Sequence, residues 1–128
     1  MKAGKGAYLW GLLLLMLTGA SWAGEVPFKQ ADYDKAVAEG KPVVVYLHAD
    51  WCPTCRAQKP ILDRLSKEAR LKDVTIFVAD FDTETALEKS LKVAQQSTFV
   101  VFRQGHEVSR STGQTQESAI RAVLEQAL

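Results

Sequence analysis

Only two cysteines occur in this chain, Cys52 and Cys55, and both lie in the segment WCPTC. Two cysteines allow at most one disulfide, which excludes a small fold held together by several bridges. A bridge between these two residues would close a very short loop and remove little entropy from the unfolded chain. A purely structural staple is therefore a weak explanation of the pair.

The chain also lacks an excess of either charge, with 16 Lys and Arg against 15 Asp and Glu. No dense basic run is interleaved with aromatic residues, so nothing is suited to holding a phosphate backbone, and we expect no nucleic-acid partner. The 128 residues, 47% of them hydrophobic, fit one compact domain. We find no internal repeat.

No apolar run reaches the roughly 20 residues that span a bilayer comfortably. The longest one, residues 7–20, follows a basic start, MKAGKG, and precedes a small-residue end, SWA. This layout predicts a secretory signal peptide over residues 1–23, cut before Gly24, and a periplasmic or otherwise exported domain over residues 24–128. An uncleaved signal anchor is the alternative, and it would leave the domain on the same side of the membrane.

The cysteine segment lies between two strong patterns. Residues 43–47 (VVVYL) form an apolar, β-branched run typical of a buried central strand. After the motif, apolar residues recur at helical spacing and predict an amphipathic helix with Pro53 in its first turn and Pro60 kinking its middle. The helical apolar residues are Ala57, Ile61, Leu62, Leu65 and Ala69.

A cysteine at such a strand-to-helix junction has unusual chemistry. The first turn of a helix offers free N–H groups and the positive end of the helix dipole, so we expect the pKa of Cys52 to fall from about 8.5 into the range of about 3.5 to 7.5. Cys55 lies one turn further into the helix and should be less exposed. It is positioned to attack a mixed disulfide formed at Cys52.

The remaining patterns alternate between helix and strand. A helix precedes the first strand, and the order after it is β-α-β-α-β-β-α, which predicts an α/β sandwich around a mixed sheet. The predicted segments are a helix at 30–40, a strand at 74–81, a helix at 83–93, a strand at 97–103, a shorter strand at 106–112 and a closing helix at 116–128.

Metal binding is the runner-up interpretation of the cysteine pair. Structural zinc needs four ligands, and the chain has no second pair of Cys or His at similar spacing. His48 lies four residues before Cys52 and could add one nitrogen to the two sulfurs. Such a site would suit copper(I), in a module that binds metal or a partner protein without turnover.

The segments VVVYLHADWCPTCRAQKP and STFVVFRQG, with Gly113, resemble an exported thioredoxin-like protein of the thioredoxin-fold family. The resemblance covers residues 25–128 and implies a thioredoxin fold, a central mixed β-sheet flanked by helices. It further implies a nucleophilic thiol at Cys52, a resolving thiol at Cys55 and an aromatic lid at Trp51, whose ring could also simply pack. Pro53 and Thr54 would help to set the reduction potential.

The same resemblance implies an enzyme, a thiol-disulfide oxidoreductase that exchanges disulfides with protein partners. Its redox partner would be another dithiol protein, for which a membrane-embedded protein is one candidate. We expect a monomer that needs no metal and no cofactor beyond its own Cys52–Cys55 disulfide.

The sequence departs from the family at the positions that handle protons. Tyr46, six residues before Cys52, replaces a buried acid, and Val78 takes the place of the lysine that pairs with that acid. His48 lies two residues beyond Tyr46 and titrates near neutral pH, so it is a candidate for tuning the thiol or carrying its proton. The alternative is that His48 merely fills space.

A second departure concerns the loop that faces the cysteines. The family places a cis-proline before the residue equivalent to Thr98, and here that position is Ser97. Because a non-proline cis bond costs about 2.5 to 4 kcal/mol, we predict a trans Gln96–Ser97 bond, with a strained cis bond as the alternative. The Ser97 hydroxyl could then approach the sulfurs, either to bond the Cys52 thiolate or to leave space for a metal.

Overall fold

The computed structural model describes residues 23–128, so the predicted signal peptide, apart from its last residue Ala23, lies outside the described residues. The elements are β1 (Gly24–Pro27), α1 (Gln30–Ala38), β2 (Val43–His48), α2 (Pro53–Leu65), the short 3₁₀ helix η1 (Ala69–Leu71), β3 (Thr75–Asp80), α3 (Thr85–Leu91), β4 (Thr98–Arg103), β5 (His106–Thr112) and α4 (Glu117–Glu125). Within residues 23–128, no helix has the length and apolar character needed to cross a membrane.

The five strands form one mixed sheet in the order β1-β3-β2-β4-β5. Strands β1 and β2 both run parallel to β3, whereas β4 pairs antiparallel with β2 and β5 pairs antiparallel with β4. The predicted central strand is confirmed, because residues 43–47 have no exposed surface. The cysteine segment therefore follows the best-buried strand of the molecule.

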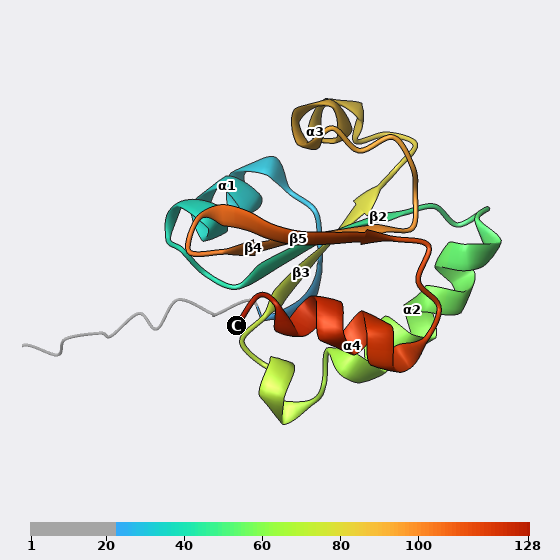
Figure 1. Cartoon of the computed structure of the whole chain (residues 1–128). Helices are drawn as coiled ribbons and strands as arrows, with labels where there is room; N and C mark the ends of the chain where they lie inside the picture. Colours follow the sequence, from blue (N-terminus) through green and yellow to red (C-terminus); the bar gives the residue numbers. More distant parts are fainter. Residues whose placement is uncertain (1–22) are drawn as a thin grey trace, which may run out of the picture.

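Two helical layers cover the sheet, with α1 and α3 on one face and α2 and α4 on the other (Figure 1). Successive side chains of a strand point to opposite faces, so β2 contributes to both cores. Val44 and Tyr46 pack in the core under α2 and α4, whereas Val43, Val45 and Leu47 pack in the core under α1 and α3. The predicted sandwich around a mixed sheet is confirmed.

The end of α1 shows how a local signal stops a helix. Gly40 has a φ of 70°, and its N–H donates to the Val37 carbonyl while the Lys41 N–H donates to the Ala36 carbonyl. This double hydrogen bond around a left-handed residue is a Schellman cap, for which glycine carries no Cβ penalty. The helix itself ends at Ala38, two residues before the predicted boundary.

Two details of the sequence prediction were wrong. The edge strand β1 was not predicted, because its four residues are too short to show an alternating pattern and gain their hydrogen bonds only by pairing with β3. The bounds predicted for β5, residues 106–112, are confirmed, but the expectation that it is the shorter of the last two strands was wrong, because β4 has six residues and β5 has seven. Its side chains are mostly exposed, and an edge strand with little burial gives a weak hydrophobic pattern.

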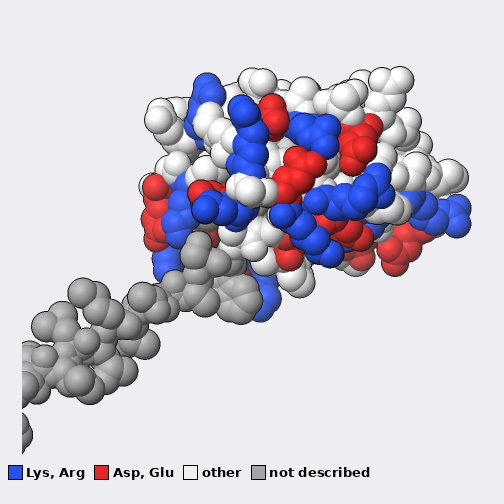
Figure 2. All heavy atoms as spheres, turned by 90° about the horizontal axis from the view of Figure 1, so that it is seen from below, with Lys and Arg blue, Asp and Glu red and all other residues white. Residues whose placement is uncertain are grey.

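The surface over α2 and α4 carries positive and negative side chains intermixed (Figure 2). Several of these charges form ion pairs between elements, such as Lys59 with Glu25 at 3.0 Å and Arg64 with Glu117 at 3.5 Å. The exposed pair of Arg64 and Glu117 is of a kind that contributes little to stability, on the order of 0 to 1 kcal/mol. This face shows no large patch of a single sign.

Candidate functional site

Cys52 lies at the junction between β2 and α2, as predicted. It is the N-cap residue of α2, and its sulfur accepts a hydrogen bond from the Cys55 backbone N–H at 3.4 Å. Pro53 occupies the first helical position, where its missing N–H costs nothing. The sulfur of Cys52 therefore sits at the end of the helix where unpaired N–H groups and the positive dipole favour an anion.

Both cysteines are free thiols and both are buried, Cys52 at 2% exposure and Cys55 at 0%. Cys55 is the less exposed of the two, as predicted, although the difference is small. By contrast, the neighbouring Trp51 is 57% exposed and donates its indole N–H to Asp82 at 2.8 Å. The ring thus lies on the surface beside the thiols, held by a carboxylate from the loop after β3.

Ser97 comes close to both sulfurs. Its Oγ lies 3.3 Å from the Cys52 sulfur and 3.0 Å from the Cys55 sulfur, and the residue is only 3% exposed. No cis peptide bond occurs in residues 23–128, so the predicted trans Gln96–Ser97 bond is confirmed. Ser97 instead has a φ of 62°, an unusual conformation for a residue other than glycine.

The surroundings of Cys52 lower the pKa of its thiol to about 6. Burial acts in the opposite direction and raises the pKa, since it penalises a charged sulfur. Hydrogen bonds outweigh burial: they come from the Ser97 hydroxyl, the Cys55 backbone N–H and the Gln96 side-chain amide, which lies 3.5 Å from the sulfur. The thiol of Cys52 is therefore mostly ionised at neutral pH.

A buried glutamine links this site to the core. Gln58 has no exposed surface, and its amide nitrogen donates to the carbonyls of Ser97 at 3.3 Å and Gln114 at 2.8 Å. Its amide oxygen accepts the hydroxyl of Tyr46 at 2.9 Å. Gln58 thus ties α2 to the loop that carries Ser97.

Sequence reasoning missed Gln58. The predicted apolar stripe of α2 included Ala57 and Ala69, yet both are exposed. The residues that α2 buries are Cys55, Gln58, Leu62 and Leu65. The signal available was the spacing itself, because Gln58 lies three residues after Cys55 and four before Leu62, on one helical face.

Tyr46 occupies the position where the family carries a buried acid, but its hydroxyl cannot accept a proton as a carboxylate does. The ring is fully buried, stacks on Phe99 with centroids 4.7 Å apart, and lies directly opposite Val78 on β3. Burial, followed by the nearby charge of Cys55, raises the pKa of the Tyr46 hydroxyl far above its ordinary value. The hydroxyl therefore stays protonated and acts as a hydrogen-bond donor.

His48 does not hydrogen-bond either sulfur. Its Nδ1 lies 3.3 Å from the Tyr46 hydroxyl, and its Nε2 lies 2.9 Å from the fully exposed carboxylate of Asp50. A hydrogen bond from His48 to Cys52 is therefore absent, and a role of His48 in tuning the thiol stays a prediction. The reason is geometric: His48 ends β2 and turns toward Asp50, while the sulfurs lie toward the Ser97 loop.

Neither Thr98 nor Thr54 hydrogen-bonds a cysteine sulfur through its hydroxyl in the described part of the chain. The Thr98 hydroxyl donates to the Gln95 carbonyl at 2.8 Å and lies 2.9 Å from the hydroxyl of Thr112, so it braces the loop rather than a sulfur. Thr54, inside the motif, is half-buried in the first turn of α2. Of the predicted site residues, only Ser97 joins the two cysteines by a side-chain hydrogen bond among residues 23–128.

The copper(I) hypothesis required His48 as a third ligand, and His48 bonds Tyr46 and Asp50 instead. No group of three or more His, Cys, Asp or Glu side chains in the described part of the chain is arranged to hold a metal ion. A pocket of about 240 Å³ lies next to the motif and is lined in part by His48, Trp51 and Asp82. The His48 ring faces this pocket and its carboxylates instead of completing a site with the sulfurs.

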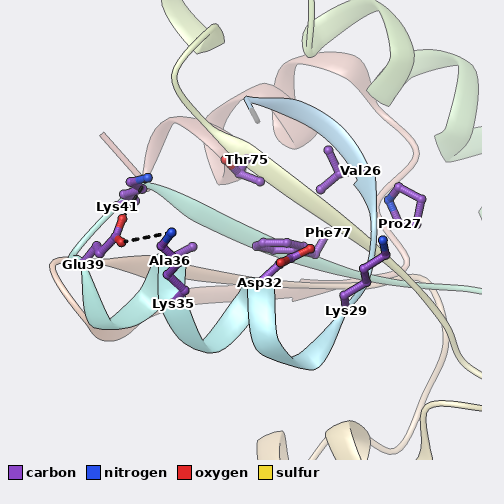
Figure 3. Close-up of a pocket in the computed structure, with 10 residues that line it drawn as sticks. All are labelled: Val26, Pro27, Lys29, Asp32, Lys35, Ala36, Glu39, Lys41, Thr75 and Phe77. Carbon is purple, nitrogen blue, oxygen red and sulfur yellow. Dashed lines mark ion pairs between the residues drawn. The ribbon is translucent and has the colours of Figure 1, made fainter. Parts of the chain in front are cut away.

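A second cavity, of about 440 Å³, lies elsewhere, between α1 and the edge formed by β1 and β3 (Figure 3). Its floor includes Val26 and Phe77, and charged side chains such as Lys29 and Lys41 stand at its rim. None of the predicted site residues lines it.

A family model, solved structures and curated relatives all indicate the same protein family. A family model described as thioredoxin matches residues 25–126. The crystal structure of Trxlp from Edwardsiella tarda is similar to this chain at 39% identity and a TM-score of 0.76, covering 79% of this chain and 98% of that one. Thioredoxin O2 from Arabidopsis thaliana, in the oxidized state, is 26% identical with a TM-score of 0.68, covering 81% and 94%. The thioredoxin of Mycobacterium tuberculosis is 28% identical over 106 residues, 83% of this chain and 82% of that protein.

Proposed function

This chain belongs to the thioredoxin family and is a thiol-disulfide oxidoreductase, and from that premise we propose that it is exported and exchanges disulfides with protein partners through Cys52 and Cys55. Thioredoxins act on protein disulfides. The specific roles of the two cysteines, the export and the choice of partner are the substance of the proposal.

The observation that carries the proposal is the hydrogen bonding around Cys52. A thiolate, and not a thiol, attacks a disulfide, and a pKa of about 6 keeps Cys52 ionised at neutral pH. Three donors, from Ser97, Gln96 and the Cys55 backbone, supply this stabilisation. We therefore assign to Cys52 the attack on the substrate disulfide.

Cys55 is assigned the resolving step. It lies one helical turn further along α2, has no exposed surface and shares the hydroxyl of Ser97 with Cys52. Because Cys55 lies further into the helix and its sulfur is the less exposed of the two, it is better placed to attack a mixed disulfide on the neighbouring sulfur than to meet a protein substrate. The redox group is then the cysteine pair itself, and the chemistry requires no organic cofactor or metal.

Docking and export complete the proposal. The exposed ring of Trp51 beside the thiols offers an amphipathic surface to a protein partner, a common role for tryptophan at interfaces. The basic start, apolar run and small-residue end of residues 1–23 support passage into the periplasm or another exported compartment. There the redox partner would be a further dithiol protein, and a membrane-embedded protein is one candidate.

A redox titration against glutathione tests the assignment. The wild-type protein should show a reversible two-electron couple with fast exchange, and both Cys52→Ser and Cys55→Ser should abolish that couple. Cys55→Ser should in addition accumulate a mixed disulfide at Cys52, because the resolving thiol is missing. Sluggish exchange together with stoichiometric copper(I) uptake would contradict the proposal and favour a binding module.

Export is tested separately, by expressing the full chain in a bacterium with a periplasm, separating the cell fractions and measuring the mass of the protein. The proposal expects the protein in the periplasmic fraction, with a mass that corresponds to a chain starting at Gly24. A full-length mass in the membrane fraction would indicate the signal anchor, and recovery from the cytoplasm would contradict export.

A further inference from the structure

The hydroxyl of Ser97 bridges the two thiols. Its oxygen lies 3.0 Å from the Cys55 sulfur and 3.3 Å from the Cys52 sulfur, in a site where Ser97 is 3% exposed. A hydroxyl has one proton to donate and two lone pairs to accept with. It can therefore accept the S–H of Cys55 and, at the same time, donate its own proton toward the sulfur of Cys52. These two hydrogen bonds form a continuous path for a proton between the cysteines.

The other groups near the motif are poorly suited to take the proton of Cys55. Tyr46 remains protonated and gives its hydrogen to Gln58, because burial and the nearby cysteines raise its pKa. His48 bonds Tyr46 and Asp50. In the part of the chain that the structure describes, no carboxylate hydrogen-bonds either sulfur.

The backbone around Ser97 holds this hydroxyl in place. The Ser97 N–H donates to the Leu47 carbonyl at 2.8 Å, and its carbonyl accepts the Gly113 N–H at 3.0 Å and the Gln58 amide at 3.3 Å. These contacts maintain a φ of 62°, a conformation sparsely populated by serine. A backbone that is held in such a conformation by its surroundings is typical of a functional position.

We propose that the Ser97 hydroxyl is a catalytic proton relay, which passes the proton of Cys55 to the sulfur that departs from Cys52. This inference rests on the proposed disulfide exchange and deepens it, since it names the group that handles the proton in the resolving step.

The reaction balances as follows. The Cys52 thiolate attacks a substrate disulfide, one Cys52–substrate S–S bond forms, the substrate S–S bond breaks, and the first substrate thiolate leaves and takes a proton from water. Cys55 then attacks the Cys52 sulfur, forming the Cys52–Cys55 disulfide and releasing the second substrate thiolate. As this happens, the Cys55 proton moves to the Ser97 oxygen and the Ser97 proton moves to the leaving sulfur. Two electrons pass from the dithiol to the substrate, Ser97 is regenerated, and the reverse sequence oxidises a substrate dithiol.

The test isolates the resolving step. Wild-type protein, Ser97→Ala and Ser97→Gly are reduced and mixed with oxidised glutathione, and release of the second glutathione is followed in a single turnover across a pH series. General acid–base catalysis typically contributes about 10²- to 10⁴-fold, so we expect both variants to resolve at least about 100-fold more slowly at neutral pH. The deficit should shrink as pH rises, because hydroxide can then take the proton in place of the relay. The solvent isotope effect of the wild-type step should change in both variants.

Two controls make the outcome decisive. Ser97→Gly lacks the hydroxyl and suits a φ of 62°, so it separates loss of the relay from strain in Ser97→Ala. Ser66→Ala removes a hydroxyl that bonds the Asp63 carbonyl at the far end of α2 and should resolve at the wild-type rate. If both Ser97 variants resolve at the wild-type rate with the wild-type pH profile, the relay is wrong while the proposed function survives. If the wild-type protein forms no mixed disulfide, the proposed function fails and the relay fails with it.

Discussion

Two regions on opposite faces of the sheet bury different chemistry. Under α1, the rings of Phe28, Tyr33, Phe77 and Phe102 contact one another edge to face or tilted, with centroids 5.7 to 6.3 Å apart. Under the start of α2, the buried groups are polar and hydrogen-bonded in a chain. We call the first set the aromatic cluster, and we call the second, formed by Tyr46, Gln58 and Ser97, the polar chain.

The difference shows how one sheet can serve two purposes. The burial of apolar ring surface is non-directional, so the aromatic cluster contributes stability without specifying the position of any reacting atom. Hydrogen bonds are directional, and a buried one contributes only about 0.5 to 1.5 kcal/mol net. The polar chain therefore adds little stability but orients a hydroxyl against two sulfurs.

The largest effect on stability is expected in the aromatic cluster. Phe77 is 3% exposed, and truncating a buried phenylalanine typically costs about 3 to 5 kcal/mol. Phe77→Ala should therefore lower the free energy of unfolding in urea by about that amount, and the pKa of Cys52 should stay at about 6 in a thiolate absorbance titration. A shift of that pKa in Phe77→Ala would show that the two regions are coupled and would break the comparison.

A smaller loss of stability, with an effect on the thiols, is expected in the polar chain. Gln58→Leu removes the acceptor of the Tyr46 hydroxyl and the donor to the Ser97 and Gln114 carbonyls, and an unsatisfied buried polar group costs about 1 to 3 kcal/mol. Because Gln58 acts through Ser97 and touches neither sulfur, it is a positioning residue. We expect the variant to raise the pKa of Cys52 and to slow mixed-disulfide resolution.

Leu62→Ala is the matched control for Gln58→Leu. Leu62 lies on the same helix and is equally buried, yet it belongs to the apolar core under α2 and α4. It should lose about 2 to 5 kcal/mol of stability and leave the pKa of Cys52 unchanged. If Leu62→Ala shifts that pKa as much as Gln58→Leu does, general loosening of α2 would account for both, and Gln58 would have no positioning role.

The smallest expected effect, counted per pH unit, is a dependence of the free energy of unfolding on pH that the Cys52 thiol causes in the reduced protein only. The folded pKa of Cys52, about 6, is lower than that of an unperturbed thiol, about 8.5 to 9.0, so the folded dithiol binds its proton less tightly than the unfolded chain does. This contribution is fully present above the unfolded pKa and is lost as pH falls through about 6. Between these values the free energy of unfolding should rise with pH by at most about 1.4 kcal/mol per unit, the limit for one proton.

Urea unfolding of the reduced and oxidised protein across this pH range checks the slope. The oxidised protein has neither thiol to titrate, so the difference between the two forms isolates the contribution of the cysteine pair. A difference that is flat between about pH 6 and 9 would mean that the thiolate is not stabilised in the folded state.

Local patterns predicted most of the fold and part of the site. The β-branched run at 43–47 and the helical spacing after the motif placed Cys52 at the junction of β2 and α2, because backbone preference and burial pattern are encoded over short stretches. Strand β1 was missed, since this short edge strand owes its structure to pairing with β3. His48 was a candidate for tuning Cys52, with simple packing as the alternative, and the structure shows it bonded to Tyr46 and Asp50.

By itself the sequence determined the chemistry at the start of α2, because a cysteine before a proline at the first helical position is a local arrangement: the N-cap residue and its free N–H groups lie within four residues. Only the tertiary structure decided what surrounds the sulfurs. Ser97 lies 45 residues beyond Cys52, and Gln58 bonds a carbonyl 39 residues away. Such contacts depend on the pairing of β4 with β2 and on the positive φ of Ser97, which no local pattern specifies. A directional hydrogen bond requires both partners within about 3.5 Å, and that proximity is set by the packing of the whole domain.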